Sequence, residues 1–256
     1  MSIAPSDPIL SQLPEEVRDT LRRYVKEIGR CFGPSLLGLM LYGSTARGEY
    51  LEGRSNLNVL GLLERHDPDA LTKYAKAHRR WGRERIVAPL LVTEADLSEW
   101  PRVFPLEYGD LLDYHIVLNG RDALIDRPLD RDRLMFQCEQ EVRGNLVRLR
   151  QRFLEGGGST EVMAILLPLS LTGLLTAFRG VIRAIAGTPP RETEHLLAEI
   201  KRQAAIESDI FEEVWRFKRG ILSPGPAELP RLYERYIEAI AAASDSVERL
   251  FRENRQ

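Results

Sequence analysis

Residues 36–64 read LLGLMLYGSTARGEYLEGRSNLNVLGLLE, and this stretch decides how the chain folds. The apolar run 36–42 ends at Gly43 and indicates a buried strand. The run GSTARGE then predicts a Gly-Ser turn that opens a short helix. Polar and apolar residues follow in SNLNVLGLLE, which predicts a second strand over 56–64. A strand, a turn and a second strand therefore come in immediate succession.

The turn carries groups that suit a phosphate. Gly43 supplies flexibility, Ser44 supplies a hydroxyl, and the backbone N–H groups that follow are free to meet phosphate oxygens. Arg47 lies one helical turn further on and could reach the same anion. We therefore expect Gly43, Ser44 and Arg47 to bind a nucleotide.

The layout of residues 36–64 resembles that of the polymerase-beta-like nucleotidyltransferase superfamily. Its members place a Gly-Ser helix before a strand bearing Asp-x-Asp, with a third carboxylate on a neighbouring strand. The resemblance implies that the paired acids hold two Mg²⁺ ions, and that the third helps to bind metal and to activate the attacking hydroxyl. The helical second half also resembles the substrate-side domain of aminoglycoside nucleotidyltransferases, by architecture alone.

The chain departs from that pattern at all three acidic positions. Asn56 and Asn58 replace the Asp pair, and their side chains share one face of the strand. Two neutral amides remove two negative charges from a site where hard cations need carboxylate oxygens. The neighbouring strand, IVAPLLV at 86–92, contains no acid. We therefore expect no metal at these degenerate positions and a nucleotidyltransferase fold that has lost metal-dependent transfer.

Two acids downstream are the remaining candidates for a displaced base or metal ligand. Glu107 and Asp110 lie in FPLEYGD at 104–110, which we expect to be a loop that packs its aromatic residues against the helical half or, alternatively, forms the lip of a cleft. They are candidate catalytic residues only if transfer survives.

The periodicity predicts two domains. Residues 1–127 alternate strands and helices, which indicates an α+β nucleotidyltransferase-like mixed sheet flanked by helices. Residues 128–256 carry helical periodicity throughout, with short loops, and indicate an all-α helical bundle. The chain should begin with a loose tail over 1–10. The helices should span 14–32, 68–80, 94–100, 130–154, 160–186, 191–206, 209–221 and 227–252, and the further strands 85–93 and 114–119.

Composition excludes several classes of protein. The formal net charge is −2, so nothing in the overall charge favours nucleic acid. Cys31 and Cys138 lie far apart, without the spacing of a zinc site or disulfide scaffold, which fits a reducing cytoplasm. The apolar run 162–178 is shorter than the roughly 20 residues that span a bilayer, so we expect a buried helix and no membrane association.

Three functions stay open. The first is a catalytically degenerate protein that binds a nucleotide or small ligand in the cleft between the domains. The second is an active small-molecule nucleotidyltransferase with atypical metal ligands, which would need Mg²⁺ and a nucleoside triphosphate. The third is a module for a protein partner, as in antitoxin-like members of this fold, and a homodimer is a further alternative.

Overall fold

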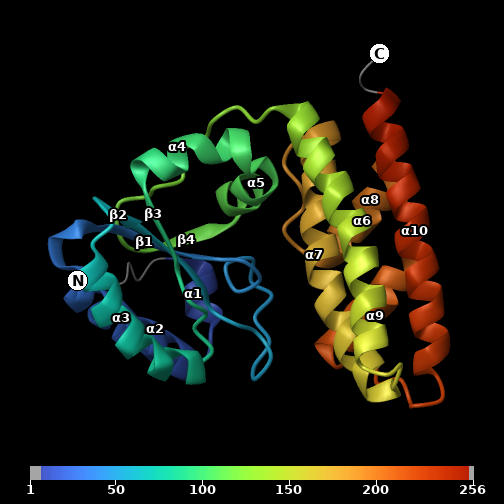
Figure 1. The fold of residues 1–256 in the computed structure, drawn as a ribbon, viewed down its shortest axis with the longest axis horizontal. Helices are drawn as coiled ribbons and strands as arrows, with labels where there is room; N and C mark the ends of the chain where they lie inside the picture. The colour runs from blue at the N-terminus through green and yellow to red at the C-terminus, as the bar shows by residue number, and fades with distance from the viewer. Residues whose placement is uncertain (1–6, 254–256) are drawn as a thin grey trace. The chain divides into compact units, whose positions relative to one another are not determined.

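The computed structural model describes residues 7–253. The chain divides into two units, Met1–Val103 with Leu111–Pro128, and Phe104–Asp110 with Leu129–Gln256. The first unit holds a mixed sheet flanked by helices, and the second is helical, so the fold class predicted from the sequence is confirmed (Figure 1).

The sheet of the first unit has the strand order β3-β2-β1-β4. The central strand β1 (Leu36–Tyr42) runs antiparallel to β2 (Asn58–Leu63) and to β4 (His115–Gly120). The edge strand β3 (Leu90–Thr93) pairs in parallel with β2. The strand expected over 85–93 is shorter in the structure because Pro89 has no N–H to donate to a ladder. An isolated parallel bridge joins Leu57 to Ile86.

Four helices accompany the sheet: α1 (Pro8–Gln12), α2 (Glu15–Phe32), α3 (Pro68–Arg83) and α4 (Glu94–Val103). The start of α2 follows Pro14, and two acids stand near the positive end of the helix dipole. Its buried face packs with α3 on one side of the sheet, where Leu21, Tyr24 and Ile28 are fully buried (Figure 1). The loose tail expected over 1–10 is wrong from Pro8 onward, where helix α1 begins. Residues 1–6 of that expected tail lie outside the described residues.

The carboxyl end of α3 has an unusual residue at its cap. Ile86 N–H donates to Trp81 O (3.0 Å) and Arg85 N–H to Gly82 O (3.2 Å), which is the pattern of a Schellman motif. The motif places Arg85 at the position that glycine usually occupies, with φ at +63°. A left-handed conformation costs a residue with a side chain about 1 to 2 kcal/mol.

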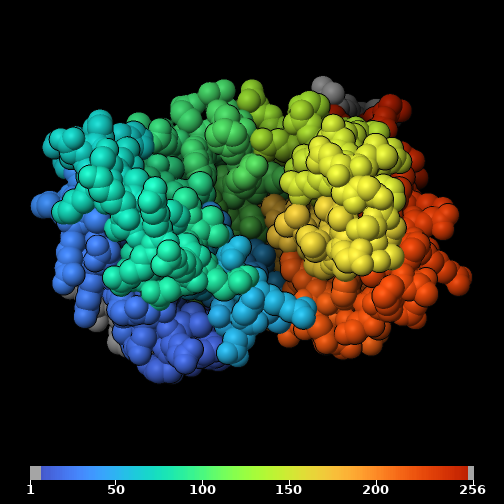
Figure 2. Space-filling view, turned by 60° about the horizontal axis from the view of Figure 1, so that its bottom comes forward, coloured from blue at the N-terminus to red at the C-terminus, as the bar shows by residue number. Residues whose placement is uncertain are grey.

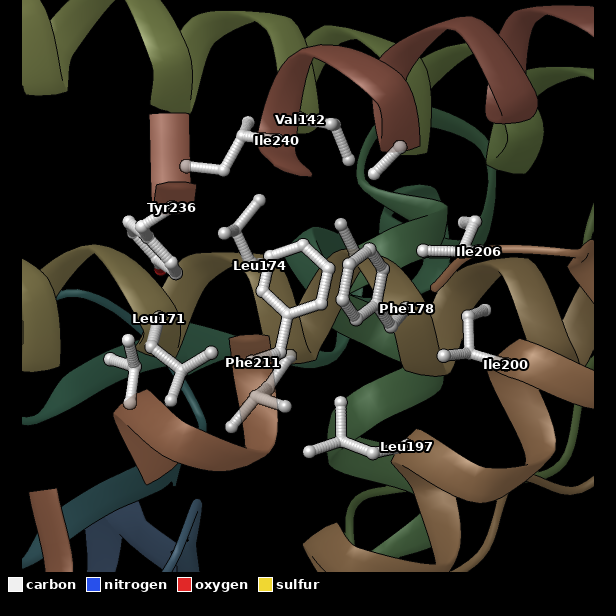
Figure 3. Packing of buried hydrophobic residues seen from close by; sticks show 14 of the residues in the cluster. Val142, Leu171, Leu174, Phe178, Leu197, Ile200, Ile206, Phe211, Tyr236 and Ile240 are labelled. Atoms are coloured by element: carbon white, nitrogen blue, oxygen red, sulfur yellow. The ribbon is translucent and has the colours of Figure 1, made fainter. Parts of the chain in front are cut away.

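The second unit contains α6 (Arg131–Glu155), α7 (Thr160–Ala186), α8 (Thr193–Ala204), α9 (Asp209–Arg219) and α10 (Leu229–Glu253), close to the ranges that the periodicity predicts. Figure 3 shows the core between them, where Phe211 packs edge-on against Phe178 (ring centroids 5.2 Å apart) and Tyr236 (5.8 Å). Within the described chain, α7 is long and apolar enough to cross a membrane, but 44% of its most apolar window is buried in this core.

The expected loop at 104–110 is wrong, because these residues begin helix α5 (Pro105–Asp113). Residues 104–110 belong to the helical unit, where Leu106 joins the core and its N–H donates to Gln137 Oε1 (2.9 Å). Gly180 of α7 makes this packing possible, since a Cβ there would lie 2.6 Å from Cys138 Sγ and would also meet Leu106. Contacts between helices far apart in sequence thus decide the conformation of this segment.

Candidate functional site

Gly43 and Asn58 meet where β1 ends and β2 begins. Gly43 has φ at +79°, and a Cβ placed on it would lie 2.9 Å from Asn58 Nδ2. Only glycine fits this position without strain, both for its backbone conformation and for the space that the amide occupies. The structure therefore brings together two of the residues that the sequence singled out.

The expected short helix is reduced to a single turn after Gly43. Arg47 N–H donates to Gly43 O (3.1 Å), Gly48 N–H to Thr45 O (3.1 Å), and Glu49 N–H to Ser44 O (2.9 Å). The last two bonds repeat the Schellman pattern of the end of α3, with Gly48 in the left-handed position at φ +82°. Ser44 stands at the start of this turn and is partly exposed.

Thr45 connects the turn to the asparagine pair. Its side chain is fully buried, and its hydroxyl donates to the backbone oxygen of Asn56 (3.3 Å). Asn56 lies just before β2, and its side chain is exposed. Two contacts therefore connect the turn to the start of β2: the hydrogen bond from the Thr45 side chain to the Asn56 backbone, and the close approach of Asn58 to Gly43.

Arg47 is buried within the turn. The residue is 9% exposed, and its Nε lies 3.5 Å from Glu49 Oε2, which is also buried. Because both charges are removed from water, the loss of either one is more costly than the pair is stabilising. The expected role of Arg47 as an anion-binding arm stays a prediction.

The two asparagines lie on the face of the sheet opposite α2 and α3. Leu41, Leu57 and Val59 point into the core that these helices cover, and side chains alternate along a strand. Asn56 and Asn58 flank Leu57 and so point the other way. Tyr42 pairs with Asn58 on one side and with His115 on the other, so the three side chains share this face.

His115 is anchored at both ring nitrogens. Its Nδ1 lies 3.0 Å from Leu111 O, and its Nε2 lies 2.9 Å from Asp122 Oδ2. This anchoring holds the ring at the end of the row that begins with Asn58. His115 is therefore a fixed member of the row that it forms with Tyr42 and Asn58.

Residues 86–92, beside the start of β2, contain no acid. Ile86 bridges to Leu57, and Val87 N–H donates to Leu57 O (3.1 Å). The register shifts by one residue between this bridge and the Leu60–Leu90 pair of β3, and the exposed residues Val87 and Ala88 lie in between. Among residues 7–253, no group of three or more His, Cys, Asp or Glu side chains could hold a metal ion.

The two downstream acids belong to the helical unit. Glu107 is exposed on α5, and Asp110 is partly buried near Arg183 of α7. Burial lowers the pKa of Arg183, and the charge of Asp110 opposes that shift. The structure does not place either acid in the unit that contains Gly43 and Asn58, and their catalytic role stays a prediction.

An open cavity of about 580 Å³ lies on the helix-covered side of the first unit. Its walls come from α2, from residues 50–57 and from the end of α3. Figure 2 shows residues 50–57, in light blue, as a projection beside α2 and the end of α3. Burial raises the pKa of the Tyr50 phenol in this wall, and the carboxylate of Glu52 raises it further. The segment that carries Asn56 therefore stands between this cavity and the asparagine face.

Three residues of this region escaped the sequence argument. Thr45 and Glu49 are ordinary polar residues in a turn, and nothing in their spacing marks them as buried. Arg85 left no signal either. Gly82 stands two residues beyond the predicted helix, where a capping glycine is common, but α3 continues to Arg83 and the left-handed position falls on Arg85.

Comparison with known proteins supports the fold. No protein-family model matches the sequence, and no curated protein matches it. Among solved structures, the chain is similar to the crystal structure of spectinomycin adenyltransferase AAD(9) from Enterococcus faecialis with ATP and spectinomycin. The TM-score is 0.56 at 11% sequence identity, over 90% of this chain and 98% of that chain. The fold is therefore nucleotidyltransferase-like across both units.

Proposed function

We propose that this chain is a degenerate nucleotidyltransferase-fold protein that binds a nucleotide at the Gly43–Asn58 corner without divalent metal and without transferring a group. The observation that carries the proposal is the contact of the Asn58 amide with Gly43 on a face that has lost its acids. Its structural neighbour was crystallised with ATP, so a nucleoside triphosphate is the first ligand to test.

Electrostatics favours metal-free binding at this face. A carboxylate 4 Å from a phosphate oxygen is repelled by about 4 kcal/mol at an effective dielectric constant of 20. Metal ions normally cancel that repulsion, and Asp at 56 and 58 would make them necessary. Asn56 and Asn58 remove the repulsion and add N–H donors, so a triphosphate can approach without the ions.

The segment 86–92 argues against the active alternative. Both the attacking hydroxyl and the ions would need a carboxylate from a strand beside Asn56 and Asn58, and this segment contains no acid. Glu107 and Asp110 could replace it only from another unit of the chain. Binding without transfer is therefore the simpler consequence of the residues present.

A thermal-shift series tests the proposal. ATP, GTP, CTP and UTP are each added to the protein in EDTA and, separately, in Mg²⁺. We expect at least one nucleotide to raise the melting temperature in EDTA, with little added effect of Mg²⁺. Saturation at 100 times the dissociation constant stabilises a protein by about 2.7 kcal/mol, which is a readily measured shift.

The other outcomes select the alternatives. A shift that requires Mg²⁺ would support the active enzyme with atypical metal ligands. No shift with any of the four nucleotides would contradict nucleotide binding and leave the partner-binding module, including a homodimer, as the better explanation.

A further inference from the structure

Arg85 combines an unfavourable backbone conformation with a side chain that reaches back to the asparagine segment. It stands at the left-handed position of the α3 cap, where glycine would be free of strain. Strain of this kind persists where the surrounding structure uses the residue. The use must lie in the side chain, because glycine would satisfy the cap.

The guanidinium of Arg85 holds two consecutive carbonyl groups. Its Nε donates to Ser55 O (3.0 Å) and its Nη2 donates to Arg54 O (2.6 Å). The backbone oxygen of the same residue accepts from Leu57 N–H (2.9 Å). One residue therefore fixes the backbone immediately before and immediately after Asn56. The planar fork of arginine suits two adjacent acceptors, whereas a lysine offers a single ammonium.

The rest of the segment is held by its own turn and by the core. Ser55 N–H donates to Leu51 O (2.8 Å), and Leu57 is buried. The open cavity borders Ser55, Leu57 and Arg85 itself, so on this side the guanidinium is the side-chain support of residues 54 and 55. The Thr45 hydroxyl also donates a hydrogen bond to Asn56 O. At 3.3 Å this bond is longer than either hydrogen bond from the Arg85 side chain.

We propose that Arg85 is a positioning residue: its guanidinium holds residues 54–57 so that Asn56 and Asn58 face the ligand in a fixed geometry. The inference rests on the proposed function, because the ligand is the nucleotide of that site. Arg85 touches the backbone of the segment and acts on the ligand only through it.

Three variants separate positioning from folding. Arg85→Gly removes both the guanidinium and the strain, Arg85→Ala removes the guanidinium and keeps the strain, and Arg85→Lys keeps the charge without the fork. We expect all three to bind the nucleotides of the thermal-shift series about ten-fold more weakly, measured by calorimetry in EDTA. We expect the melting temperature of Arg85→Gly to stay near that of the wild type, because the lost bonds and the relieved strain offset each other.

Two further readouts follow the segment itself. Hydrogen exchange of the peptide containing residues 51–57 should become faster in Arg85→Gly, with or without nucleotide, while exchange in α7 stays unchanged. Methylguanidinium at low millimolar concentration can enter the open cavity. It should raise the nucleotide affinity of Arg85→Gly towards the wild-type value and leave the affinity of the wild type unchanged.

Each outcome has one consequence. The inference would be overturned, and the proposed function would stand, if Arg85→Gly bound nucleotide as tightly as the wild type does. The same conclusion would follow if the loss of affinity in the three variants paralleled their loss of melting temperature. If the wild type binds no nucleotide, the proposed function fails, and unchanged exchange at 51–57 in Arg85→Gly would overturn the inference independently.

Discussion

The side-chain amide of Asn58 occupies the space in which a side chain on Gly43 would lie, with only 2.9 Å between Nδ2 and a Cβ at that position. The turn after β1 and the first residue of β2 are therefore shaped together. A metal-binding Asp at position 58 would bring a charge to this same point, whereas an amide brings donors and no charge.

Gly43→Ala is expected to abolish the nucleotide-dependent thermal shift. The new methyl group meets Asn58 Nδ2, and the backbone must hold φ at +79° with a side chain present. The control is Gly157→Ala, because Gly157 has φ at +65° and nothing within 4 Å of an added Cβ. Both variants should lose about 1 kcal/mol or more from the backbone. Equal nucleotide shifts in the two variants would count against a site at Gly43.

Restoring acids should restore metal binding only when the third position is included. Asn56→Asp with Asn58→Asp gives two carboxylates on one face, and adding Val87→Asp supplies a third on the neighbouring segment, next to the Leu57–Ile86 bridge. Because affinity for hard cations rises with the number of charged oxygen ligands, the triple variant should bind Mn²⁺ roughly ten-fold more tightly than the double variant.

Electron paramagnetic resonance of free Mn²⁺ measures this difference, with Val87→Asp alone as the control. The double variant should also lose the metal-free nucleotide shift, since its carboxylates repel the triphosphate. Nucleotide transfer by the double variant alone would show that the third acid is not missing.

The Arg47–Glu49 pair should matter for stability far more than surface pairs do. Glu49→Gln removes the carboxylate that lies 3.5 Å from the buried Arg47 guanidinium, and we expect a loss of about 3 kcal/mol. The matched control is Glu99→Gln, which breaks the exposed pair of Glu99 with Arg102 and should cost less than about 1 kcal/mol. Urea unfolding followed by hydrogen exchange of peptides from the sheet unit measures both. Equal losses would mean that the Arg47 charge has another adequate partner.

The sequence predicts those parts of the fold that depend on local periodicity. The apolar run 36–42 is β1 residue for residue, and α7 has the bounds that its helical pattern predicts. The shared face of Asn56 and Asn58 also follows from the sequence alone, because alternation along a strand needs no tertiary information.

What the sequence does not reveal depends on distant contacts. Residues from Pro105 onward form a helix in which Leu106 packs against the Gly180 and Cys138 surfaces, and local sequence does not reveal this partner. The burial of Arg47 beside Glu49 in the turn after β1 is likewise invisible in the sequence. The side-chain hydrogen bonds of Arg85 reach a segment 30 residues earlier in the chain. In each case the decisive interaction is set by tertiary geometry.

The buried tyrosine pair of the sheet unit predicts a loss of stability at alkaline pH. The hydroxyls of Tyr24 and Tyr74 lie 2.9 Å apart in the core. Burial raises the pKa of Tyr74 to about 12, and burial raises that of Tyr24 further above its ordinary value. The unfolded chain releases these protons near pH 10, whereas the folded chain keeps them. The stabilising effect is therefore complete below pH 10 and is lost as the pH rises from 10 towards 12, by roughly 1.4 kcal/mol per pH unit for each tyrosine.

Tyr74→Phe removes one of these titrating groups, together with the hydroxyl hydrogen bond to Tyr24 (2.9 Å) and the longer one to His78 (3.4 Å). At pH 8 the variant should be about 1 kcal/mol less stable than the wild type. Between pH 10 and 12 its stability should fall less steeply, by roughly 1.4 kcal/mol per pH unit, so that the two curves converge and cross. Urea unfolding of the sheet unit across this range measures the slopes. Tyr233→Phe is the control in the helical unit, where it should leave the slope of the sheet unit unchanged. Parallel curves for Tyr74→Phe and the wild type would show that Tyr74 ionises in the folded protein at its ordinary pH.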